Sequence, residues 1–200
     1  MLELLKRTLN QMIKRLSSRQ IHQNQWLSLR EDQVSFNEKT TGVYTVVDKP
    51  DFALIVPYDG KFLYLVKQFR YPLGIDFIEF PSGSHEEKDL SQEFQLAKDE
   101  LREETGLSSQ QISKVGILRE VPGLINQQCH LFYATNLIQG EQELEATEAD
   151  LQVIKLTPAE FEKQVSCGEI CDCKTIAAYY LCRNRFNSSE SAPTTPRLQK

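Results

Sequence analysis

The sequence predicts an α/β protein of the α+β kind, built around one hydrophobic core. Two strongly apolar runs, Phe52 to Tyr58 and Phe62 to Phe69, have the length and composition of buried strands. The stretch that ends at Gly106 has the apolar spacing of an amphipathic helix. With 200 residues and 40% hydrophobic content, the chain can bury one core of good size. We therefore expect one main domain with short extensions.

The charge balance and the cysteines narrow the class of protein. A net charge of −5 and a pI near 5.3 argue against a general nucleic-acid-binding protein, which normally carries a basic face. The sequence contains no apolar run of the roughly 18 residues that a membrane-spanning helix needs. The N-terminus lacks the apolar region of a secretory signal, and five cysteines, an odd number, favour reduced thiols. We expect a cytoplasmic protein without nucleic-acid or membrane partners.

Residues 1–25 are expected to contain an amphipathic helix that runs from Met1 to about Leu16. Its apolar stripe is formed by Leu2, Leu5, Leu9, Met12, Ile13 and Leu16. A basic helix of this kind could lie on a membrane surface or act as a transit peptide. Packing on the domain or on a second subunit is the more ordinary interpretation.

Strands are predicted on both sides of residue 50. Residues 26–48 contain short alternating runs separated by polar turns, at Trp26–Leu29, Val34–Phe36 and Val43–Val47. Farther along, Asp59-Gly60 separates the two apolar runs, which is a strong signal for a β-hairpin.

The helix that ends at Gly106 carries three glutamates on one face. Glu100, Glu103 and Glu104 lie at i, i+3 and i+4, so their side chains are neighbours. Like charges at this spacing repel one another, and a divalent cation that prefers oxygen ligands, Mg²⁺ or Mn²⁺, would relieve the repulsion. The alternative is an acidic face that is simply solvated. A second, apolar face is marked by Phe94, Ala97 and Leu101.

Beyond residue 107 the pattern returns to strands and then to helices. Strands are expected at Val115–Val121, His130–Asn136 and Leu151–Ile154, with an acidic loop at Glu141–Asp150. Thr157-Pro158-Ala159-Glu160 is a capping box that begins a helix, and Gly168 is expected to end it. A last helix is expected from about Lys174 to Phe186, followed by a disordered tail over residues 187–200. The four cysteines of this region, Cys167, Cys171, Cys173 and Cys182, fit no common zinc spacing.

The region around the glutamates resembles the signature of the Nudix hydrolase family. Asp99 to Leu107 reads DELREETGL, which matches the second half of the family box at every fixed position except the first. The family's arginine is Asp99 here, its upstream glutamate falls on Ser91, and Gly83 lies two residues farther upstream. In the family that glutamate and arginine form a structural pair, whereas the later glutamates hold metal. The resemblance implies a rebuilt loop and a retained metal face.

The flanking motifs resemble the ADP-ribose pyrophosphatase branch of that family. This branch carries Gln-aromatic-Arg, here Gln68-Phe69-Arg70, followed by a motif that corresponds to Glu79-Phe80-Pro81-Ser82-Gly83. The resemblance implies that Arg70 binds the phosphates of the substrate and that the carbonyl of Ser82 joins the metal ligands. Glu79 would orient Arg70 or contact the substrate. For Arg70 the alternative is an ion pair at the end of a strand.

The resemblance also implies a catalytic base, a substrate contact and a dimer. The branch places its base on a loop before an aliphatic strand, so Glu148 is the expected base and Glu145 the reserve. Gly123 follows a proline that the branch carries near its substrate pocket. His130, a lone histidine beside an apolar run, is more typical of a structural role. The N-terminal strands imply a homodimer.

The expected protein is thus a Nudix fold, a mixed sheet between helices, with residues 49–186 as the hydrolase domain. Its expected reaction is metal-dependent hydrolysis of ADP-ribose or a related nucleoside diphosphate sugar, with Glu104 and Glu148 in catalysis. Two alternatives stay open. The chain could hydrolyse another nucleoside diphosphate derivative, such as GDP-mannose or a dinucleotide. It could also bind ADP-ribose without hydrolysing it.

Overall fold

The computed structural model describes residues 13–37, 39–84, 92–144, 148 and 150–186. Two sheets form the centre of the molecule. The first has the order β7-β4-β9-β8, in which β4 and β9 are parallel and the other pairs antiparallel. Its strands are β4 (Phe52–Pro57), β7 (Ser82–Gly83), β8 (Leu107–Leu118) and β9 (Cys129–Gln139). The second sheet, β10-β5-β6, is antiparallel and consists of β5 (Leu63–Arg70), β6 (Ile75–Glu79) and β10 (Gln152–Leu156).

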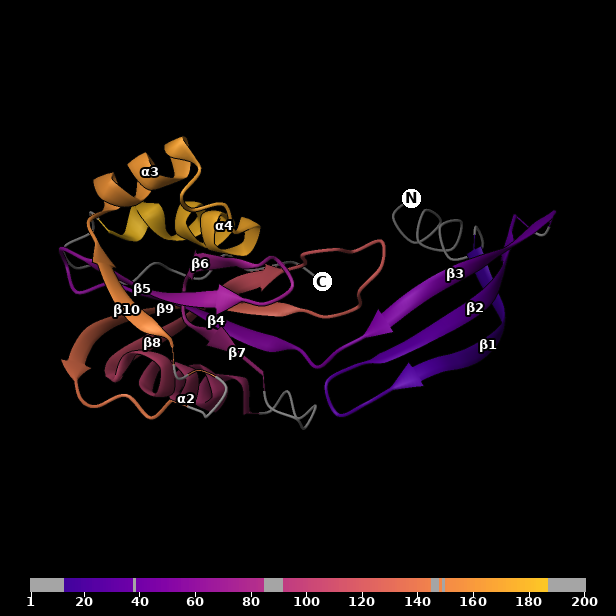
Figure 1. Ribbon diagram of the computed structural model, residues 1–200, viewed down its shortest axis with the longest axis horizontal. Helices are drawn as coiled ribbons and strands as arrows, with labels where there is room; N and C mark the ends of the chain where they lie inside the picture. The colour runs from indigo at the N-terminus through magenta and orange to yellow at the C-terminus, as the bar shows by residue number, and fades with distance from the viewer. Residues whose placement is uncertain (1–12, 38, 85–91, 145–147, 149, 187–200) are drawn as a thin grey trace, which may run out of the picture.

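Helices cover these sheets on both sides, as Figure 1 shows. Helix α2 (Glu93–Thr105) lies on one side, and α3 (Pro158–Cys167) and α4 (Cys173–Cys182) lie on the other, where a short 3₁₀ turn, η3 (Arg183–Arg185), follows. Strand β4 contributes to both cores, because Ala53 and Ile55 pack toward α2 whereas Leu54 and Val56 pack toward α3 and α4. The predicted mixed sheet between helices is confirmed.

A third, three-stranded antiparallel sheet precedes this domain and extends away from it (Figure 1). Its strands are β1 (Ile13–Gln23), β2 (Ser28–Phe36) and β3 (Thr40–Asp48), in the order β1-β2-β3. The helix predicted from Met1 to about Leu16 is therefore wrong over Ile13–Leu16, which belong to β1, while its first part lies outside the described residues. The backbone N–H and C=O groups of β1 form hydrogen bonds with β2. The helix prediction used only the local apolar spacing, which does not reveal that a partner strand is present.

The second half of the predicted strand Trp26–Leu29 and the predicted strand Val34–Phe36 are in fact joined into the single strand β2, whereas Trp26 and Leu27 precede it. The polar residues between them are accommodated by ion pairs. Arg30 donates to Asp32 at 3.2 Å and also pairs with Asp48 on β3. A strand can carry buried charge when each charged group has such a partner.

The predicted hairpin at Asp59-Gly60 is a turn between two sheets rather than a hairpin. The Asp59 carboxylate accepts from the backbone N–H groups of Lys61 and Phe62, at 2.8 and 2.7 Å, which fixes the turn. The two sides meet in the isolated bridge Tyr58↔Leu63 and do not continue as a ladder, because β4 pairs with β9 and β7 while β5 pairs with β10 and β6. Strands this apolar are buried on both faces, and each finds its partners elsewhere in the chain.

The remaining elements follow the predictions closely. Helix α2 ends at Gly106, whose φ of 69° is the left-handed C-cap conformation. The capping box of α3 is formed by Thr157 and Glu160 as predicted, and α4 with η3 fills the expected last helix. Strand β8 begins at Leu107 instead of Val115, because its polar first half pairs along β9. Residues 187–200, the predicted tail, lie outside the described residues, and the described part contains no helix long and apolar enough to cross a membrane.

Candidate metal and diphosphate site

The three glutamates of α2 are turned toward strand β7 by the packing of the helix. Ala97 and Leu101 are fully buried against β4 and β9, which fixes the rotation of the helix about its axis. Phe94, the third residue of the predicted apolar face, is 43% exposed, and Leu96 is buried in its place. The predicted apolar face is wrong at this position, because the first turn of α2 lies at the edge of the core.

Strand β7 meets this glutamate face directly. The backbone N–H of Ser82 donates to Oε2 of Glu104 at 2.9 Å. A Cβ added to Gly83 would collide with the carboxylate of Glu100, so any other residue there would displace that carboxylate. Ser82, Gly83, Glu100 and Glu104 are therefore brought together as the sequence predicts. The contact of Ser82 runs through its N–H, and the metal-binding role of its carbonyl stays a prediction.

Glu104 has the most perturbed environment of the group. It is 3% exposed, and burial raises the pKa of its carboxyl well above the usual value, with further increases from the charges of Glu100 and Glu148. The hydrogen bond from the Ser82 N–H and the charge of Arg70 lower this pKa. A buried carboxylate beside other carboxylates needs a positive charge to stay ionised. The donor set of hard oxygens fits a divalent cation such as Mg²⁺.

Glu103 lies at the outer rim of the glutamate face. Its Oε1 accepts from Arg102 at 3.1 Å, and its side chain is 33% exposed. Arg102 also pairs with Glu143 in the loop after β9, and the backbone N–H of Glu143 donates to the carbonyl of Glu103 at 3.1 Å. These contacts attach the acidic loop after β9 to the end of α2. The catalytic base is expected on this loop.

The two candidates for the base are placed differently. Glu148 lies close enough to Glu104 for its charge to raise the pKa of that carboxyl. The reserve candidate, Glu145, lies outside the described residues. The structure thus brings Glu148 to the glutamate face, and its role as base stays a prediction.

Arg70 ends strand β5 and forms an ion pair with Glu79 at the end of the adjacent strand β6. Its Nε donates to Oε2 of Glu79 at 2.6 Å, and the Arg70 side chain is 38% exposed. Glu79 is 4% exposed, and its other oxygen, Oε1, accepts from the ammonium group of Lys174 on α4. The predicted strand-end ion pair is therefore present. The charge of Arg70 also acts on the glutamate face, because it lowers the pKa of Glu104.

Gly123 lies in the loop between β8 and β9, and this loop runs toward the N-terminal sheet (Figure 1). The neighbouring carbonyl of Leu124 accepts from the backbone N–H of Val47 on β3 at 2.9 Å, and Ile125 forms a bridge with the same residue. Gly123 itself is exposed, and its predicted contact with substrate stays untested.

His130 has the structural role that its position in the sequence favours. Its Nδ1 lies 2.7 Å from Glu93 in the first turn of α2, and its Nε2 lies 3.3 Å from Asp51. Lys114 on β8 completes the cluster by pairing with Glu93. These groups attach the start of α2 to the sheet, away from the glutamate face at its other end.

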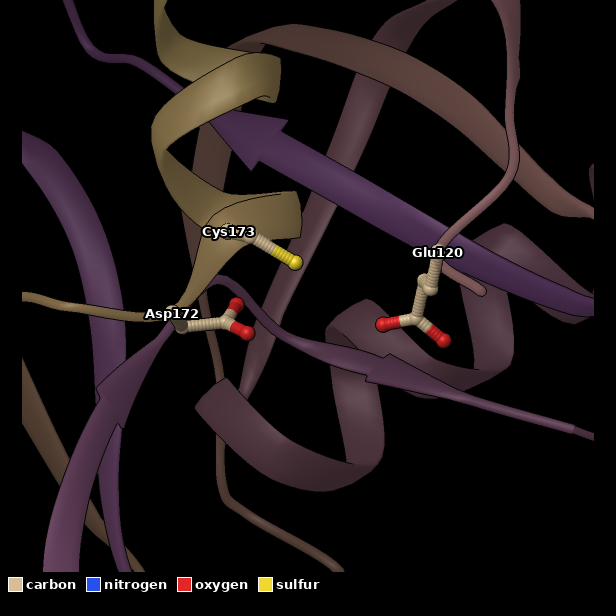
Figure 2. Close-up of side chains that lie close together, drawn as sticks. All are labelled: Glu120, Asp172 and Cys173. Atoms are coloured by element: carbon tan, nitrogen blue, oxygen red, sulfur yellow. The ribbon is translucent and has the colours of Figure 1, made fainter. Parts of the chain in front are cut away.

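A second group of potential metal ligands lies at the start of α4, where Figure 2 shows Glu120, Asp172 and Cys173 side by side. One ligand atom from each lies within 4.8 Å of the others. Asp172, however, is the N-cap of α4: its Oδ2 accepts from the N–H of Thr175 and from Lys174, both at 2.9 Å. Because a lysine and a helix cap already explain this carboxylate, we assign no metal here.

Sequence reasoning missed Lys174. It lies in the first turn of α4, far along the chain from Glu79, and a single lysine in a helix carries no local signal of burial. Asp172, two residues before Lys174, is the N-cap and was the feature that could have placed the start of this helix correctly.

Comparison with known proteins agrees with this fold. Residues 13–47 match the model of the nucleoside diphosphate sugar hydrolase N-terminal domain. An ADP-ribose pyrophosphatase of Bacillus subtilis is 29% identical, over 82% of this chain and 89% of that protein. An uncharacterized Nudix hydrolase of Schizosaccharomyces pombe is 34% identical over 48% of this chain and 47% of its own length. A solved structure of an ADP compounds hydrolase covers 88% of this chain and 94% of its own, with a TM-score of 0.75 and 18% identity.

The α+β fold with its mixed sheet is the fold of the solved ADP compounds hydrolase. In sequence the chain is similar to nucleoside diphosphate sugar hydrolases over its N-terminal sheet, and to a Nudix hydrolase and ADP-ribose pyrophosphatases farther along.

Proposed function

We propose that the protein hydrolyses the diphosphate bond of ADP-ribose or a related nucleoside diphosphate sugar, releasing AMP and ribose 5-phosphate from ADP-ribose. The observation that carries the proposal is the environment of Glu104. This buried carboxylate accepts the Ser82 N–H and is influenced by the charges of Glu100, Glu148 and Arg70. Three carboxylates and one guanidinium around one point form a site for a metal ion and a phosphate group together. The similarity to ADP-ribose pyrophosphatases supports this choice of substrate.

The proposed roles follow from the chemistry of each side chain. Glu100, Glu103, Glu104 and Ser82 would hold a divalent ion, Mg²⁺ or Mn²⁺, which when bound neutralises phosphate charge and makes a water more acidic. Arg70 would bind the diphosphate through its guanidinium group, oriented by Glu79. Glu148 would accept a proton from the attacking water, and Gly123 would lie beside the substrate.

We further propose that the protein acts in the cytoplasm as a homodimer. All five cysteines are free, which suits a reducing compartment. The N-terminal sheet exposes large apolar side chains, among them Leu16 at 54% and Val43 at 54%, which a second copy of the chain would cover.

The decisive experiment is AMP release from ADP-ribose with Mg²⁺, measured for the native chain and for Glu104→Gln. We expect release that requires the metal and falls by at least about a hundredfold in the variant, because the metal face loses a charged ligand. The native chain is also assayed with GDP-mannose and a dinucleotide. Binding of ADP-ribose without hydrolysis would contradict the proposed activity, and turnover of another compound alone would contradict the proposed substrate.

A further inference from the structure

A chain of buried ion pairs joins Arg70 to the first turn of α4. Arg70 donates through Nε to Oε2 of Glu79 at 2.6 Å, and Lys174 donates to Oε1 of the same carboxylate. Lys174 also donates to Asp172, the N-cap of α4, at 2.9 Å. The side chains of Glu79, Lys174 and Asp172 are 5%, 11% and 10% exposed. Two cations and two anions therefore balance one another, with Glu79, Lys174 and Asp172 buried and Arg70 at the surface end.

The same turn of α4 also holds the backbone next to Glu79. The Thr175 hydroxyl accepts from the backbone N–H of Phe80 at 3.0 Å, and Thr175 is fully buried. Phe80 lies between Glu79 and the Ser82–Gly83 strand that faces the glutamates. The first turn of α4 is thus fixed both to the partner of Arg70 and to the segment that enters the metal site.

Lys174 changes how Glu79 can bind Arg70. A carboxylate and a guanidinium pair preferentially with two parallel hydrogen bonds, which would use Nε and one terminal nitrogen of the arginine. Here Oε1 of Glu79 is occupied by Lys174, so only Oε2 is bonded to Arg70. Among the described residues, the side chain of Arg70 makes no hydrogen bond through its terminal nitrogens.

Lys174 keeps its charge despite its burial. Burial acts to lower the pKa of its ammonium group, but the charges and hydrogen bonds of Glu79 and Asp172 outweigh this, and the pKa lies above the usual value. The lysine is therefore a charged partner of Glu79.

We propose that Lys174 is a positioning residue for the diphosphate of the substrate. By occupying Oε1 of Glu79, it limits that carboxylate to one bond with Arg70 and keeps both terminal nitrogens of the guanidinium available for phosphate oxygens. This inference rests on the proposed function, in which Arg70 binds the diphosphate. Without Lys174, Glu79 takes Arg70 in a two-bond pair and competes with the substrate for it.

The test compares the native chain with Lys174→Met, using two measurements. The first is the KM and kcat for ADP-ribose with Mg²⁺, and the second is the Kd for ADP-ribose in EDTA, by calorimetry. We expect KM and Kd to rise about tenfold, because the substrate loses one charge-assisted hydrogen bond to Arg70. The kcat should change by less than about twofold. Lys174→Arg, which keeps the charge, is expected to restore most of the affinity.

Two further variants separate positioning from stability. Lys174→Met combined with Asp172→Asn removes one charge of each sign and keeps an N-cap, so it is measured if the single variant does not fold. It should show the same rise in KM. Thr157→Ala, which weakens the unrelated cap of α3, serves as the control of reduced stability and should leave KM unchanged.

The outcomes distinguish the two proposals. If the native protein hydrolyses ADP-ribose, and Lys174→Met and the double variant keep the native KM and Kd, the proposed role of Lys174 is overturned and the proposed function stands. Equal losses in KM, kcat and thermal stability, reproduced by Thr157→Ala, would reduce Lys174 to a structural residue. Native protein that neither binds nor hydrolyses ADP-ribose would overturn the proposed function and this inference with it.

Discussion

Gly83 shows how one missing side chain creates space for the site. The carboxylate of Glu100 occupies the place where a Cβ would be, and the preceding residue donates its N–H to Glu104. The position of the Glu100 carboxylate therefore depends on glycine at residue 83. The same residue was recognisable from the sequence, because it follows Pro81-Ser82 in the motif shared with the resembled branch.

We expect Gly83→Ala to displace the carboxylate of Glu100 and to lower kcat by about a hundredfold, since a displacement of about 1 Å at a catalytic group has that effect. The affinity for Mn²⁺, measured by electron paramagnetic resonance, should fall as well. Gly116→Ala is the matched control, because a Cβ at Gly116 in β8 meets nothing within 4 Å. Equal activity of the two variants would show that β7 does not shape the site.

At the scale of the element, local signals predicted the helices well and the strands less well. The end of α2 at Gly106 and the capping box of α3 depend on residues within one turn, so the sequence alone contains them. Strand β1 and the separation of β4 from β5 depend on partners elsewhere in the chain, which periodicity does not reveal. Lys174 escaped prediction for the same reason, because its partner Glu79 lies in another sheet.

The α3 cap offers a test of element stability that is independent of the site. Thr157 accepts from the N–H of Glu160 at 3.3 Å, and the Glu160 carboxylate accepts from the Thr157 N–H at 2.8 Å and from its hydroxyl at 2.7 Å. We expect Thr157→Ala to lower the free energy of unfolding by about 1 kcal/mol. Thr157→Ser, which keeps the hydroxyl, should be close to native. Urea denaturation measures the difference, and an unchanged midpoint for Thr157→Ala would contradict the assignment.

The same cap predicts a dependence on pH. Its hydrogen bonds lower the pKa of Glu160 below the ordinary value of 4.5. Because the folded-state pKa is the lower one, the carboxylate stabilises the fold above pH 4.5, and this contribution is lost as the pH falls through the folded-state pKa. Glu160→Gln does not titrate, so the native chain should lose stability more steeply than this variant under acid conditions. Parallel curves for the two proteins would contradict the prediction.

At the scale of the whole molecule, the site is assembled from both layers around the sheets. Helix α2 supplies the glutamates from one side, and α4 on the other side supplies Lys174, which reaches Arg70 through Glu79 (Figure 1). The loop between β8 and β9 meanwhile binds β3 through Leu124 and Val47. The N-terminal sheet is therefore attached to the domain by a loop that leads from the edge strand β8 into the central strand β9.

The exposed face of that sheet predicts a dimer that a single substitution should weaken. Val43 on β3 is 54% exposed, beside other large apolar side chains of the same sheet. If a second copy of the chain covers them, light scattering will give twice the chain mass for the native protein. Val43→Glu places a charge in the apolar contact and should raise the dissociation constant at least about tenfold. Ile138→Glu, at a β9 residue that is 49% exposed outside this sheet, is the matched control and should remain dimeric. Two results would show that this face is not the interface. One is a native protein with the mass of one chain at every concentration, and the other is equal dissociation of the two variants.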